Sequence, residues 1–97
     1  MPEVKVSSEW DVPCIATIRL HGNEQGLGVT VDKTTGTKSL HVPSPSGDRN
    51  IESWDVLFEY MINRAKRREC VEIKEGDRQK EVINITVSYV NGEFLVR

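Results

Sequence analysis

The longest helical pattern of hydrophobic residues in the chain lies between residues 51 and 67. Apolar side chains recur there at intervals of three and four positions, as they do on one face of an α-helix. The apolar stripe consists of Ile51, Trp54, Leu57, Phe58, Met61, Ile62 and Ala65. Acidic residues stand near the start of this segment and basic residues near its end, which suits the helix dipole. The pattern predicts one long helix over about 51–67.

Apolar and polar residues alternate on both sides of this segment, which is typical of β-strands with one buried face. Alternation predicts strands over 14–21, 27–31, 40–42, 70–74, 82–90 and 93–96. The segment 33–37 contains a glycine and predicts a hairpin turn. Asn91-Gly92 predicts a type I′ hairpin that pairs Tyr89 with Phe94 and Val87 with Val96.

The sequence therefore predicts an α+β fold. We expect an antiparallel sheet of about five to seven strands, with the helix packed on one face and the order β-β-β-α-β-β-β. The face toward the helix would carry Ala16, Ile18, Leu20, Val29, Val31, Leu40, Val42, Ile83, Ile85, Val87, Tyr89, Phe94 and Val96. Residues 1–97 form a single domain, in which 1–11 is either a flexible tail or an edge strand.

Composition excludes several classes of function. The apolar fraction is 37%, the charged fraction 29% and the net charge −2, so no global field attracts nucleic acid or an anionic membrane. No segment has the roughly 20 consecutive apolar residues that cross a bilayer. Residues 1–11 lack the apolar stretch of an export signal. We expect a cytoplasmic protein in which Cys14 and Cys70 are reduced.

Candidate catalytic and metal-binding residues are few. Cys14, Cys70, His21 and His41 contain no closely spaced pair of the kind that binds zinc. Cys14 is predicted to face the core and His21 the solvent, which argues against a nucleophilic Cys–His pair. We therefore expect no metal and no cofactor, and catalysis ranks third among the possible functions.

The stretch Gly26-Leu27-Gly28-Val29 resembles, over about a dozen residues, the first hairpin of PDZ domains. That resemblance implies a loop whose backbone amides receive a peptide carboxylate. The predicted order of strands and helix after this hairpin departs from the family pattern, so the family is not assigned.

Two surfaces remain as candidates for binding. On a helix over 51–67, the side opposite the apolar stripe carries a row that favours contact with a protein partner or a homodimer, formed by Val56, Tyr60, Asn63 and Arg67. A non-enzymatic interaction domain acting through this row and a sheet edge is the leading prediction. The alternative is binding of the nucleic-acid phosphate backbone by the basic cluster Arg64, Lys66, Arg67, Arg68 and Lys74.

Overall fold

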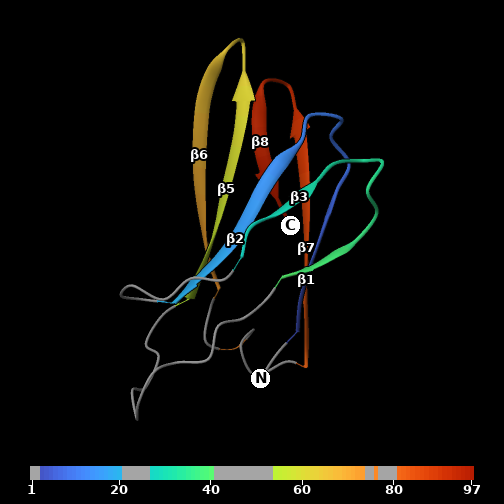
Figure 1. Cartoon of the computed structure of the whole chain (residues 1–97), viewed down its shortest axis with the longest axis vertical. Coiled ribbons are helices and arrows are strands. Elements are labelled where there is room, and N and C mark those ends of the chain that lie inside the picture. Colours follow the sequence, from blue (N-terminus) through green and yellow to red (C-terminus); the bar gives the residue numbers. More distant parts are fainter. Residues whose placement is uncertain (1–2, 21–26, 41–53, 74–75, 77–80) are drawn as a thin grey trace.

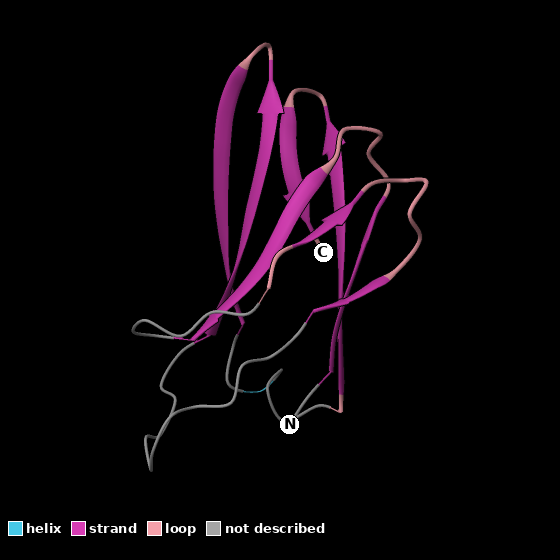
Figure 2. Ribbon diagram, viewed as in Figure 1, coloured by secondary structure: helices cyan, strands magenta, loops and turns pink. Residues whose placement is uncertain are grey.

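The computed structural model describes residues 3–20, 27–40, 54–73, 76 and 81–97. All eight elements in these ranges are strands (Figures 1 and 2). They are β1 (Glu3–Ser8), β2 (Cys14–Leu20), β3 (Val29–Val31), β4 (Lys38–Leu40), β5 (Trp54–Ile62), β6 (Ala65–Ile73), β7 (Val82–Val90) and β8 (Glu93–Val96).

The strands form two four-stranded sheets, in the orders β4-β1-β7-β8 and β3-β2-β5-β6. Figure 1 shows the sheets as two layers that face each other. Neighbouring strands are antiparallel except β1 and β7, which are parallel and join the two ends of the sequence. The architecture is a β-sandwich, in which each sheet buries one face against the other.

The prediction of a helix over 51–67, and with it the α+β fold class, is wrong. Residues 54–73 form the hairpin of β5 and β6, and residues 51–53 lie outside the described part of the chain. The two turn residues, Asn63 and Arg64, have φ angles of 50° and 66°. Two successive residues with positive φ are the geometry of a type I′ turn, whose twist matches that of the flanking strands.

The burial of β5 explains why a strand forms there. Val56, Phe58 and Tyr60 are buried at every second position, while the carboxylates of Asp55 and Glu59 alternate with them and remain partly exposed. This period of two is the period of a strand, and aromatic and β-branched residues favour strands. The buried face of β5 packs against the β4-β1-β7-β8 sheet. The segment therefore contacts a sheet, as expected, but it does so as a strand and not as a helix.

The core lies between the sheets and takes side chains from both. The predicted apolar face is confirmed for its described side chains, which are buried or packed against the core, but they face a second sheet instead of a helix. Of the predicted members, Val42 lies outside the described residues, and so does the side chain of Leu20. Val4 and Val6 of β1 are fully buried core residues that the sequence pattern did not identify.

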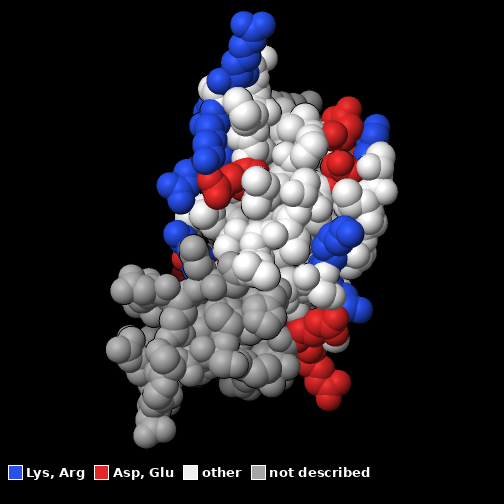
Figure 3. Space-filling model, in the orientation of Figure 1, with Lys and Arg blue, Asp and Glu red and all other residues white. Residues whose placement is uncertain are grey.

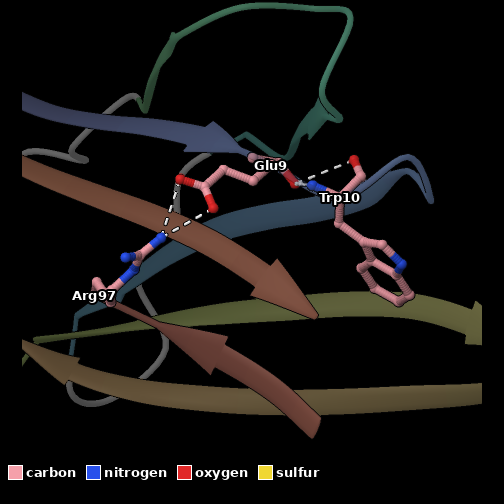
Figure 4. A network of polar contacts seen from close by, with 4 residues as sticks. Glu9, Trp10 and Arg97 are labelled. Atoms are coloured by element: carbon pink, nitrogen blue, oxygen red, sulfur yellow. Dashed lines mark hydrogen bonds and ion pairs between the residues drawn. The ribbon is translucent and has the colours of Figure 1, made fainter. Parts of the chain in front are cut away.

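Residues 3–8 form a strand with neighbours on both sides, since β1 lies between β4 and β7. The chain then crosses to the other sheet through residues 9–13. Figure 4 shows Glu9 directed toward Arg97, whose Nη2 donates hydrogen bonds of 3.0 and 2.9 Å to the two carboxylate oxygens. The indole of Trp10 points away from this ion pair and stacks on Tyr89 with ring centroids 4.5 Å apart.

The two hairpin predictions have different outcomes. The Asn91-Gly92 turn is confirmed, with φ angles of 53° and 79°, and Tyr89 pairs with Phe94 as expected. The 33–37 segment does form a turn, but it does not close a hairpin. Because β3 pairs with β2 and β4 pairs with β1, this segment carries the chain from one sheet to the other.

Candidate interaction surface

The outer face of the β3-β2-β5-β6 sheet, which is the face turned away from the second sheet, carries an apolar groove. Its volume is about 630 Å³, within the range of ligand-binding pockets. Ile15 of β2 and Met61 of β5 are 46% and 59% exposed, and both line it. They point outward because their neighbours Cys14, Ala16 and Tyr60 are buried. The groove is lined by Val12, Pro13, Ile15, Thr30, Glu59, Tyr60, Met61 and Lys66.

One end of the groove is charged. Lys66 Nζ lies 3.0 Å from Glu59 Oε2, and Arg68 Nε lies 3.9 Å from the same oxygen. Two cations therefore share one carboxylate, which leaves this end of the groove with an excess of positive charge. Both cationic side chains are at least 60% exposed, so a bound group would reach them without displacing buried structure.

A second polar cluster joins three strands of the same outer face. Arg19 of β2 donates hydrogen bonds of 2.7 and 3.0 Å to the two carboxylate oxygens of Asp55 on β5. Its Nη2 also lies 3.3 Å from Cys70 Sγ on β6. The hydrogen bond to Asp55 raises the pKa of Arg19 further above its ordinary range. The guanidinium thus stays charged and links β2, β5 and β6 across the sheet.

Aromatic side chains gather between the sheets, where a hollow of about 370 Å³ opens beside Tyr60 and Tyr89. Tyr60 stacks on Phe94 with centroids 4.9 Å apart. The hydroxyl of Tyr60 donates to Glu69 Oε1 at 3.3 Å. Burial raises the pKa of Tyr60, and the charge of Glu69 adds to the effect. These contacts hold the rings inside the sandwich and make this cluster part of the core.

The predicted row of Val56, Tyr60, Asn63 and Arg67 is not a surface. Its members were placed on one side of a helix, whereas in the strand Val56 is fully buried and Tyr60 is 6% exposed. Asn63 lies in the β5–β6 turn, and Arg67 lies opposite Tyr60 on the exposed strand β6.

The predicted basic cluster is brought together in part. Arg64 lies in the turn, and Lys66, Arg67 and Arg68 follow on β6, whereas Lys74 lies outside the described residues. Figure 3 shows lysine and arginine side chains along the margin of the molecule where β6 runs. Successive residues of a strand point to opposite faces, so Arg67 lies on the face opposite Lys66 and Arg68. All six aromatic residues are buried or half-buried, so none is presented for stacking with bases.

Sequence reasoning missed Met61 as a surface residue, and it did not recognise Ile15, which the alternation over 14–21 places opposite the core face, as part of an apolar patch. Met61 was assigned to the buried stripe of a helix that does not form. The available signal was the alternation itself, since Ile15 and Met61 occupy outward positions if residues 14–20 and 54–62 are both strands. Two apolar residues at outward positions of neighbouring strands indicate an exposed apolar patch.

Within the described ranges, no group of three or more His, Cys, Asp and Glu side chains could hold a metal ion. The same ranges contain no helix long and apolar enough to cross a membrane. No family model, curated protein or solved structure matches this chain.

Proposed function

We propose that this chain is a non-enzymatic interaction domain that binds a segment of a partner protein in the groove of the outer face. The segment is apolar with an acidic residue beside it. One observation carries the proposal: Ile15 and Met61 expose apolar side chains that line the same groove, which has a cationic end.

The chemistry of the groove supports this partner. Burial of a hydrophobic side chain against its apolar wall contributes a favourable free energy of about 25 cal/mol per Å² of apolar surface removed from water. Lys66 and Arg68, which share Glu59, favour a carboxylate at the same end. Methionine adapts its shape readily, which suits a surface that receives a flexible segment.

The test is selection of binding peptides from a random display library, followed by affinity measurement with the purified domain. We expect the selected peptides to combine apolar and acidic residues. The substitution Met61→Lys should weaken their binding at least tenfold, or about 1.4 kcal/mol. The matched control is Leu95→Lys on the other sheet, where the side chain is 42% exposed and outside the groove.

The control should bind the peptides as the parent chain does. If no peptide is enriched, or if both substitutions weaken binding equally, the groove is not the binding site. Folding of each variant is checked by its unfolding midpoint, since both replaced side chains are exposed and surface substitutions usually change stability little.

The alternative is that the basic strand β6 binds the phosphate backbone of nucleic acid. The run Lys66, Arg67 and Arg68 supports it, but Glu59 already neutralises part of this charge. A DNA duplex whose retention weakens steeply with added salt would favour this function. Replacing Arg67 and Arg68 by glutamine should then abolish retention, whereas Met61→Lys should not weaken it.

A further inference from the structure

Strand β6 is a long edge strand of the described β3-β2-β5-β6 sheet. All nine of its residues pair in continuous register with β5, from Trp54 with Ile73 to Ile62 with Ala65. On its other side it has no neighbour within the described part of the chain, and Figure 1 shows it at the margin of the molecule. Natural edges are protected by shortness, proline, a bulge or charged side chains; β6 lacks the first three, and its charges admit only a neighbouring strand with the complementary charge pattern.

The charges of β6 are separated along its length. Lys66, Arg67 and Arg68 occupy the first half, and Glu69 and Glu72 the second. An antiparallel neighbour of the same sequence sets the positive half of each strand against the negative half of the other. A parallel neighbour in register would set like charges together, which is unfavourable. The strand is therefore complementary to itself in one orientation.

We propose that two copies of this chain associate through their β6 edges, as antiparallel neighbours about a two-fold axis. The partner at this edge is a second copy of the chain. The contact joins the β3-β2-β5-β6 sheet of one copy to the same sheet of the other, which gives one continuous sheet of eight strands. It leaves the apolar side chains of Ile15 and Met61 free and engages, of the residues assigned to the groove, only Arg68 at the cationic end, so it does not rest on the proposed function.

The charges also select the register. A two-fold axis perpendicular to the sheet pairs outer-face residues with outer-face residues of the other copy. The axis must therefore lie between one residue of β6 and the same residue of the other β6. An axis at Arg68 or at Glu69 sets two like charges against each other. An axis at Cys70 sets Arg68 opposite Glu72 twice, and within residues 67–73 no like charges lie directly opposite each other.

The side chain of Cys70 fits this register. It is exposed on the outer face, where Arg19 contacts its sulfur at 3.3 Å. The two Cys70 residues meet at the axis, where directly opposite residues have Cα atoms about 5.5 Å apart or less. This separation allows a disulfide. Arg68 is free to turn to the new Glu72, since its contact with Glu59 is the longer of the two at 3.9 Å.

The contact spans seven residues of each strand, 67–73, and belongs to the small interfaces that bury less than about 1,200 Å². We therefore expect a reversible dimer that dissociates on dilution. Sedimentation velocity of the full chain, under reducing conditions from micromolar to millimolar concentration, should show monomer converting to dimer.

Charge reversal gives the decisive comparison. Arg68→Glu and Glu72→Arg should each weaken dimerisation at least tenfold, because each sets like charges opposite each other at both Arg68–Glu72 positions. The double variant should restore dimerisation, because opposite charges then face each other again. The matched control, Glu93→Arg on β8, reverses an exposed charge at a different edge and should dimerise as the parent does. A chain that stays monomeric at millimolar concentration overturns the proposal. A dimer that neither Arg68→Glu nor Glu72→Arg weakens also overturns the proposal.

Oxidative cross-linking of Cys70 tests the proposed register of the two β6 strands. Mild oxidation with diamide should cross-link the parent chain through Cys70, and Cys70→Ser should remove the cross-link but keep the reversible dimer. Cys14 is fully buried and should not react. Cross-linking that survives Cys70→Ser, or a reversible dimer whose Cys70 thiols do not cross-link, would contradict this register.

Discussion

Cys14 gives the sharpest test of how the sandwich is packed. Its side chain is fully buried in β2, and burial raises the pKa of the thiol from 9.0 to about 11. The folded chain therefore holds the thiol neutral at pH values where the unfolded chain ionises it. Because the folded pKa is the higher one, this stabilisation is fully present below pH 9 and is lost as the pH rises from 9 to 11.

The magnitude follows from the shift. Two pKa units correspond to about 3 kcal/mol, and about 2 kcal/mol of this is lost by pH 11. Tyr60 acts in the same direction, since its pKa is also raised. The contribution of Cys14 must therefore be measured as a difference between the parent and a variant that lacks the thiol.

The assay is urea unfolding at pH 8 and pH 11 under reducing conditions. We expect Cys14→Ala to lower stability at pH 8, because it leaves a small cavity, but to lose about 2 kcal/mol less than the parent on going to pH 11. Ile18→Val is the matched control, since it leaves a small cavity in the same strand but keeps the Cys14 thiol, and should lose as much as the parent. If Cys14→Ala loses as much as the parent, the thiol is not buried as described.

Three further substitutions test the packing. Phe58→Ala removes a fully buried ring and should lower the free energy of unfolding, measured in urea, by about 3–5 kcal/mol, against less than about 1 kcal/mol for exposed Leu95→Ala. Gly92→Ala places a methyl group at a φ angle of 79° and should cost about 1–2 kcal/mol by the same measurement. Arg19→Ala should cost less than about 1 kcal/mol, decreasing with added salt, because Arg19 and Asp55 are each about one-third exposed.

The strands that alternate strictly were predictable from the sequence. In β2 the buried Cys14, Ala16 and Ile18 stand at every second position, and only a strand places them on one face. The last hairpin was predictable to the residue because Asn91-Gly92 fixes both the turn and the register. Local chemistry decided both elements.

The β5–β6 hairpin was not predictable in the same way, because apolar residues also stand among the carboxylates on the outer face of β5. Leu57 is 6% exposed although its neighbours Val56 and Phe58 are buried on the opposite face. With apolar residues on both faces, intervals of three and four fit the segment as well as intervals of two. Asn63-Arg64 was a weak turn signal, because arginine is uncommon at positive φ.

The predicted row of Val56 and Tyr60 was misplaced for the same reason. A change of period from 3.6 to 2 moves Val56 and Tyr60 from a helix surface into the core, and it moves Met61 from the core to the surface. The division of the strands into two sheets was also hidden, because the parallel pairing of β1 with β7 joins residues nearly 80 positions apart, such as Val4 with Ile83. No local pattern contains that information.

Both proposals depend on β5 and β6 being paired strands, and nuclear Overhauser contacts across residues 54–73 test this pairing most directly. We expect contacts between the backbone protons of opposite residues, from Trp54 with Ile73 to Ile62 with Ala65. Strong contacts between successive amide protons, together with contacts three residues apart along the same segment, would show a helix and contradict the sandwich.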